Sequence, residues 1–133
     1  MLFSDKKLNP REYGPLALAY IGDTIFDLYI RTKILEQGNR HVTDMHKAAV
    51  DYVRAASQAK IVHIIEPMLD EEETWALKWG RNAKVNTHPK GATLAEYHLA
   101  TGFEALLGFL YLNGREQRLR EILDTAYANF NEE

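Results

Sequence analysis

Two acidic side chains stand inside the two most apolar stretches of the sequence. Asp23 lies within "LALAYIGDTIFDLYI" (16–30), and Glu104 lies within "ATGFEALLGFLYL" (100–112). A buried carboxylate is costly unless it is hydrogen-bonded, paired with a positive charge, protonated or bound to a cation. Neither stretch places a lysine or arginine within one helical turn of its acid. We therefore consider Asp23 and Glu104 first as candidates for a catalytic or cation-binding role.

A divalent cation is one way to hold two such carboxylates together. Oxygen ligands and the absence of cysteine favour a hard ion, Mg²⁺ with Mn²⁺ as a substitute, over zinc. Asp27 shares a helical face with Asp23, and the Thr101 hydroxyl, one turn before Glu104, could orient a ligand or a water. Such a site suits hydrolysis of a phosphodiester. Spacing alone leaves a second reading open, in which each acid is a satisfied core group.

The elements that must position these acids are helices. Apolar residues recur at helical spacing almost throughout, and strict alternation over the length of a strand is absent. The pattern predicts an all-α domain with about five main helices, at about 15–36, 43–66, 71–80, 94–112 and 115–130. Capping boxes are predicted at Asp70 with Glu73 and at Thr93 with Glu96.

The first and fourth of these helices are apolar nearly all round, which is typical of central helices packed on several sides. Gly22, Gly102 and Gly108 lie inside them, although glycine costs about 1 kcal/mol in a helix relative to alanine. The glycines predict a close approach of the two helices near Gly22 and Gly102. Such a crossing would let the carboxylates of Asp23 and Glu104 converge.

These two stretches resemble the motifs of the ribonuclease III family. "LAYIGDTIFDLYI" is similar to the signature in which an apolar helix carries Leu-Glu-Phe-Leu-Gly-Asp. "ATGFEALLGFLYLNG" resembles the family's second motif, Ala-Asp-x-x-Glu-Ala-x-x-Gly-x-x-Tyr-Leu. The chain length and the segment "RNAKVNTHPKGATLAEYHLATGFEALLG" look most like the Mini-III ribonucleases, which consist of the catalytic domain alone.

The resemblance implies that residues 1–133 form a single all-α catalytic domain, a homodimeric, Mg²⁺-dependent endoribonuclease that cleaves double-stranded RNA. It further implies maturation of the large-subunit (23S) ribosomal RNA precursor, and leaves open whether a ribosomal protein presents that substrate. By motif, Asp23 and Glu104 are the catalytic and metal-binding acids. Ala19 and Thr101 replace a Glu and an Asp of the larger enzymes, so the number of metal ions per site stays open.

A basic segment could hold the RNA, although the net charge of the chain is −3. Residues 78–90, "KWGRNAKVNTHPK", contain four basic residues and no acid. Duplex RNA is gripped mainly through phosphates and 2′-hydroxyls, which such side chains can contact. With the resemblance, this predicts RNA contacts from Arg81, Asn82, Lys84, Thr87, His88 and Lys90. Composition alone would slightly favour a solvated loop.

Composition and hydropathy bound the remaining expectations. With 133 residues, 46% hydrophobic and 26% charged, the chain reads as one globular domain, and without cysteine it has no disulfide. No stretch reaches the roughly 18–20 apolar residues that span a bilayer, so we expect a cytoplasmic protein without membrane contact.

Ile25, Phe26 and Tyr29 are candidates for part of a dimer interface. Two other functions stay open: a non-catalytic RNA-binding or ribosome-assembly module, and a helical protein-interaction domain.

Overall fold

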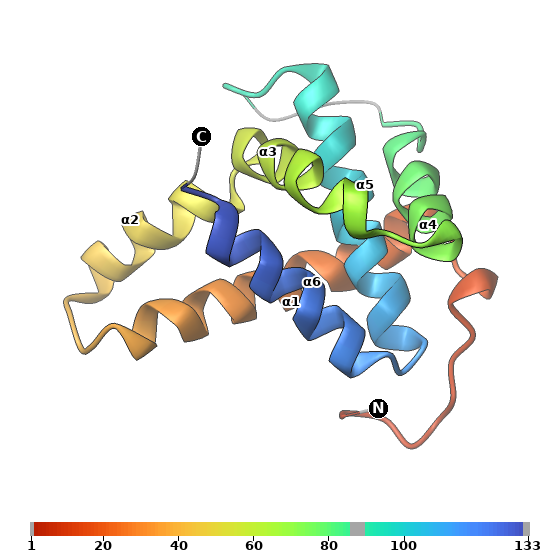
Figure 1. The fold of residues 1–133 in the computed structure, drawn as a ribbon, viewed down its shortest axis with the longest axis horizontal. Coiled ribbons are helices and arrows are strands. Elements are labelled where there is room, and N and C mark those ends of the chain that lie inside the picture. Colours follow the sequence, from red (N-terminus) through yellow and green to blue (C-terminus); the bar gives the residue numbers. More distant parts are fainter. Residues whose placement is uncertain (1, 86–89, 132–133) are drawn as a thin grey trace.

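The computed structural model describes residues 2–85 and 90–131, and these form an all-helical fold (Figure 1). None of the described residues is in a strand, so the predicted all-α class is confirmed. The elements are η1 (Pro10–Glu12), α1 (Pro15–Glu36), α2 (Val42–Val53), α3 (Ala55–Ile65), η2 (Glu66–Met68), α4 (Glu71–Arg81), α5 (Leu94–Leu112) and α6 (Glu116–Asn129). None of the described helices has both the length and the apolar character that a membrane crossing needs.

The predicted count of five main helices is wrong, because the expected helix 43–66 is two helices. The chain turns at Arg54, whose φ of −67° and ψ of 155° are extended. Within this junction (51–58), the side chains of Ser57 and Gln58 donate to the freed backbone carbonyls of Asp51 and Val53, over 2.5 and 2.8 Å. Neither proline nor glycine marks the break, so the helical spacing runs through it unchanged.

Helices α1 and α5 form the centre of the molecule, as the apolar pattern predicts. In Figure 1, α5 (teal to blue) crosses α1 (orange), and α3 and α4 lie on either side of α5. Phe26 of α1 packs edge-on against Phe103 of α5, with 5.1 Å between ring centroids, and both are almost fully buried. Helix α5 is buried on most of its faces, which explains its nearly continuous apolar sequence. Helix α1 differs from this expectation, because one of its faces, which includes Tyr20 and Leu28, is exposed.

The close approach of α1 and α5 is confirmed at Gly22 and differs from expectation at Gly102. A Cβ on Gly22 would overlap the backbone carbonyl of Glu104, and one on Gly108 would overlap that of Leu18. A Cβ on Gly102 would instead meet the Leu77 carbonyl at 2.6 Å, on α4. Gly22 and Gly108 therefore seat α1 on α5, whereas Gly102 seats α4 on another side of the same helix.

Both predicted capping boxes are present. The Asp70 side chain accepts from the backbone N–H of Glu73 over 2.8 Å, and Glu73 accepts from the backbone N–H of Asp70 over 3.0 Å. Thr93 and Glu96 make the same pair of bonds over 3.0 and 2.9 Å. These bonds satisfy backbone donors that have no partner inside the helix, and they fix where α4 and α5 begin.

Glu73 also forms a buried ion pair that the sequence pattern did not indicate. Its side chain is 0% exposed and accepts from Nε and Nη2 of Arg118, on α6, over 2.7 and 2.8 Å. Burial alone would raise the pKa of Glu73, but hydrogen bonds from Arg118 and from the Asp70 backbone hold the pKa below its usual 4.5. The pair ties the start of α4 to α6.

Replacing Glu73 by glutamine is expected to lower the free energy of unfolding by about 2 kcal/mol near neutral pH, because charge-assisted bonds to Arg118 are lost. Glutamine can keep the capping box, so the change isolates the charge. A carboxylate with a lowered pKa stabilises the fold above its usual pKa of 4.5, and this contribution disappears as the pH falls through the lowered value. Urea unfolding measured from neutral to acidic pH should therefore show the two proteins converging in acid; a pH-independent difference would contradict this.

Candidate active site

The crossing of α1 and α5 brings the carboxyls of Asp23 and Glu104 together. Gly22 lies against the backbone of Glu104, so the next residue of α1 faces the side chain of Glu104. The two carboxyls are close enough for Asp23 to raise the pKa of Glu104, through a side-chain hydrogen bond and through its charge. Asp23 itself is exposed and Glu104 is half-buried. The expectation of a buried Asp23 is therefore wrong, because Asp23 follows the buried Gly22 onto the solvent-facing side of α1.

Burial and the neighbouring negative charge together make Glu104 a weak acid. Burial raises the pKa of Glu104, the hydrogen bond and charge of Asp23 raise it further, and the result is about 8. In the part of the chain that the structure describes, neither carboxyl forms an ion pair with a basic side chain. The pair therefore holds either one proton or one cation at neutral pH.

A third polar side chain, Gln58 of α3, touches the pair and was missed in the sequence. Its Nε2 donates to Glu104 Oε2 over 3.3 Å, and the side chain is only 3% exposed. Its Oε1 is buried without a hydrogen-bond partner among the described residues. The available signal was a glutamine on the second half of a predicted helix, in "AASQAKIVHII", but this run has other polar residues and the partner of Gln58 lies 46 residues away.

The donor set fits a hard divalent cation. The described residues hold no cluster of three or more histidine, cysteine or acidic side chains suited to a metal ion. Mg²⁺, however, usually keeps several waters and needs only one or two carboxylates together with substrate phosphates. Two facing carboxyls without a basic partner, beside a buried amide oxygen that lacks a partner, match that requirement.

The auxiliary candidates Asp27 and Thr101 have partners of their own. Asp27 Oδ2 lies 3.1 Å from Nε of Arg31, one turn further along α1. The buried Thr101 hydroxyl donates to the Tyr97 carbonyl over 2.9 Å, so its proton is already committed. Ala19, where larger relatives carry an acid, is buried in the core. A role for Asp27 or Thr101 at the cation stays a prediction.

The basic loop (81–90) begins against the helix that carries Glu104. Arg81 ends α4, and its backbone lies so close to Gly102 that a Cβ there would stand 3.1 Å from the Arg81 nitrogen. Asn82, Lys84 and Lys90 are exposed. Thr87 and His88, also predicted to contact RNA, lie outside the described residues. Gly102 and Glu104 are two residues apart and so about 200° apart around α5, which places the start of the loop on the side of α5 away from Glu104.

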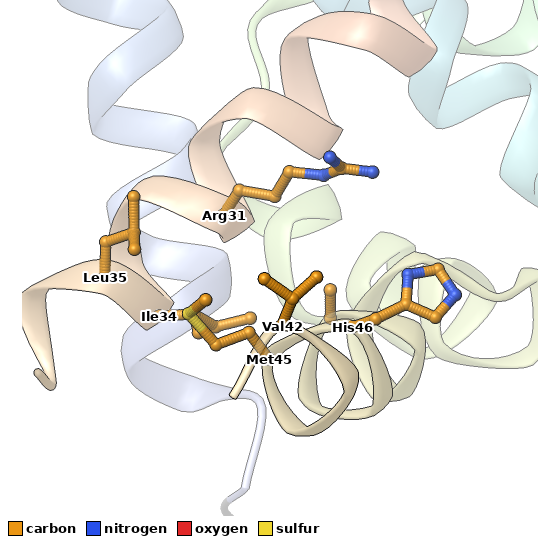
Figure 2. Close-up of a pocket in the computed structure, with 7 residues that line it drawn as sticks. Arg31, Ile34, Leu35, Val42, Met45 and His46 are labelled. Atoms are coloured by element: carbon orange, nitrogen blue, oxygen red, sulfur yellow. The ribbon is translucent and has the colours of Figure 1, made fainter. Parts of the chain in front are cut away.

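A separate hollow of about 230 Å³ lies between the second half of α1 and α2 (Figure 2). Ile34, Leu35, Val42 and Met45 make its lining mainly apolar, with the guanidinium of Arg31 at one side. None of its lining residues is Asp23, Gln58 or Glu104. The hollow is therefore distinct from the carboxyl pair.

Comparison with known proteins places this arrangement in a family. Residues 16–115 match the model of the ribonuclease III domain. The chain is 53% identical over 111 residues to a Mini-ribonuclease 3 of Thermoanaerobacter sp., covering 84% of this chain and 78% of that protein. It is 47% identical over 118 residues to a Mini-ribonuclease 3 of Symbiobacterium thermophilum, covering 89% and 91%.

The fold is also similar to a solved structure. A crystal structure of a Fusobacterium nucleatum protein, 34% identical in sequence, superposes with a TM-score of 0.81 and covers 90% of this chain and 95% of that one. The helix arrangement, the two motifs and the sequence identity over most of the chain therefore all point to the same family. The chain belongs to the ribonuclease III family, in its Mini-ribonuclease 3 branch, and is an endoribonuclease of the type that acts on double-stranded RNA.

Proposed function

We propose that Asp23 and Glu104 are the catalytic acids and that they hold Mg²⁺, for which Mn²⁺ can substitute. The observation that carries the proposal is the pair itself: two carboxyls in contact at the edge of a helix crossing, one with a pKa of about 8, without a basic partner among the described residues. If the two acids had only a structural role, we would expect an arginine or lysine to form an ion pair with them. Family membership identifies the phosphodiester of duplex RNA as the bond cleaved.

The chain's own residues contribute position and charge. Asp23 is exposed and Glu104 is half-buried. Their carboxylate oxygens would supply negative charge to the cation beside the phosphate. Gly22 keeps them together by letting the α1 backbone lie against α5. When bound, Mg²⁺ would supply a Lewis acid that polarises the phosphate and lowers the pKa of water.

The proposed function is tested by incubating the chain with an end-labelled RNA duplex, with Mg²⁺ or with EDTA. Discrete products only with Mg²⁺ are expected, and the same duplex in single-stranded form should remain largely uncut. Binding that survives EDTA, without products at any Mg²⁺ or Mn²⁺ concentration, would instead support a non-catalytic RNA-binding module.

The cellular substrate proposed from the Mini-III resemblance is the precursor of large-subunit (23S) ribosomal RNA, in the cytoplasm. Mapping the 5′ and 3′ ends of this RNA in cells with and without the protein tests the assignment. Extended ends on depletion are expected, and unchanged ends would contradict it. Adding purified ribosomal proteins to the cleavage reaction would show whether one of them presents the substrate.

We further propose that residues 1–133 act as one catalytic domain and that the basic loop binds the RNA backbone. The exposed side chains of Lys84 and Lys90, close in sequence to Arg81 at the α5 helix, support this. Lys84→Ala should reduce the slope of log affinity against log salt by about one, the effect of losing one phosphate contact. Filter binding with non-cleaving Asp23→Asn protein measures it, with the exposed Lys7→Ala as control. Equal slopes for both substitutions would contradict the proposal.

Of the residues predicted for part of the homodimer interface, Phe26 is buried on Phe103, whereas Ile25 and Tyr29 are half-buried and stay candidates. The Tyr29 hydroxyl donates to Asp124 of α6 over 2.5 Å. The exposed apolar residues of α1 beside Asp23 are Leu16 and Tyr20, and Tyr20 is 81% exposed. An aromatic side chain so exposed, one turn before a catalytic acid, is typical of an interface near the site.

Tyr20→Arg is therefore expected to shift the protein from dimer to monomer at micromolar concentration, since a charge cannot be buried unpaired at a two-fold contact. Sedimentation velocity of the parent and the variant measures the change. Leu35→Arg, about four turns further along α1 and also exposed, is the control and should remain dimeric. A dimeric Tyr20→Arg protein, or a monomeric parent, would contradict the proposal.

A further inference from the structure

Gln58 lies where the backbone break after α2 meets the carboxyl pair. Its terminal amide has two N–H donors, and both are used. One donates to the Val53 carbonyl over 2.8 Å and the other to Glu104 Oε2 over 3.3 Å. The Val53 carbonyl can only accept, so the amide nitrogen must face these two oxygens and the amide cannot be turned over. The orientation of Gln58 is thereby set.

The remaining atom of this amide is unsatisfied. Gln58 Oε1 is buried and has no partner among the described residues, although buried polar atoms are nearly always hydrogen-bonded. The polar contacts of this amide are therefore those of its nitrogen, with Val53 and with Glu104. A side chain needed only to close the α2–α3 junction would not require the second of these contacts.

We propose that Gln58 is a positioning residue of the active site: its amide nitrogen holds Glu104 Oε2 in place. The inference rests on the proposed function of the Asp23–Glu104 pair. Fixing one oxygen of Glu104 prevents the carboxyl from rotating away from Asp23. Partners that orient a metal-ligating carboxylate in this way raise the affinity of the site for its cation.

The experiment measures binding of Mn²⁺ alone to the RNA-free protein, by electron paramagnetic resonance of the free ion. Gln58→Met keeps the length and unbranched shape of the side chain and removes both of its polar contacts. We expect Mn²⁺ to bind about tenfold more weakly, as is typical when a partner of a metal-ligating carboxylate is removed. The Mg²⁺ concentration for half-maximal cleavage should rise by a similar factor.

Ser57→Ala is the matched control. The Ser57 hydroxyl closes the same α2–α3 junction by donating to the Asp51 carbonyl, and it is buried like Gln58. If Gln58 acted only on the junction, both substitutions would weaken Mn²⁺ binding alike, and the proposal would be overturned. Parent-like Mn²⁺ binding in a folded Gln58→Met protein would overturn it too.

A second variant decides the matter if Gln58→Met does not fold. Gln58→Asn keeps the amide and shortens the side chain by one methylene, so its nitrogen cannot reach Glu104 and Mn²⁺ should again bind about tenfold more weakly than to the parent. Unchanged affinity, or a failure of both variants to fold, would make Gln58 purely structural. If the unchanged protein neither binds Mn²⁺ nor cleaves duplex RNA, the proposed function is contradicted. If the unchanged protein does both and Gln58→Met binds Mn²⁺ equally well, only the inference about Gln58 is contradicted.

Discussion

Asp23→Asn is expected to slow cleavage of duplex RNA by about a hundredfold or more at saturating RNA, because a cation at a reacting phosphate supplies several kcal/mol of charge stabilisation. Asparagine keeps the shape of the side chain and removes one of the two negative charges that hold the cation. Asp23 is exposed, so the fold should be unaffected. Asp44→Asn, at an exposed acid of α2, is the matched control and should cleave at the parental rate.

The same substitution has a second readout that does not need RNA. Without the charge of Asp23, the pKa of Glu104 should fall below about 8 but stay above its usual 4.5, because burial, the largest cause of the rise, remains; carboxyl NMR titration of the metal-free protein measures this. A carboxyl with a raised pKa binds a proton more tightly in the folded state, so parental stability should fall as the pH rises from 4.5 to about 8. Asp23→Asn should flatten that decline. Full cleavage activity in a variant with the lowered pKa would refute catalysis by this pair.

Gly22→Ala is expected to destabilise the fold by about 3 kcal/mol or more, at the upper end of overpacking costs. The added Cβ would overlap the backbone carbonyl of Glu104, and a backbone atom inside a helix cannot turn aside as a flexible side chain can. The helices must move apart, which also separates Asp23 from Glu104. Cleavage by the protein that remains folded should therefore fall as well.

Urea denaturation of Gly22→Ala and Gly14→Ala provides the comparison. A Cβ on Gly14, before the first turn of α1, meets nothing within 4 Å, and its φ of −70° suits alanine. That substitution should cost less than about 1 kcal/mol, the loss of a glycine N-cap. A Gly22→Ala protein as stable as Gly14→Ala would show that α1 and α5 do not depend on this close contact.

Several features followed directly from residue types and spacing. Helical periodicity indicated the all-α class, and the short-range hydrogen bonds of Asp70 with Glu73 and of Thr93 with Glu96 are capping boxes that spacing predicts. The apolar character of residues 16–30 and 100–112 identified the two helices at the centre. Such features are encoded within a few residues, so no knowledge of the packing is needed to find them.

Other features depend on which distant residues meet. Neither proline nor glycine marks the break at Arg54, so the apolar spacing continues through it. The carbonyls that the break frees, those of Asp51 and Val53, accept hydrogen bonds from the side chains of Ser57 and Gln58. The partner of Glu73 is Arg118, 45 residues away, and a capping role already accounted for that glutamate. Side-chain contacts of this kind have no sequence period.

For the candidate active site, the sequence by itself indicated the two acids that we propose as catalytic and the glycine that lets their helices meet. Only the tertiary structure decided that Asp23 faces solvent, that Glu104 carries the raised pKa and that Gln58 is their third neighbour. The physical reason is that exposure, desolvation and charge coupling depend on distances through space. Asp23, Gln58 and Glu104 come from three helices, and only the crossing of α1 with α5, flanked by α3, sets those distances.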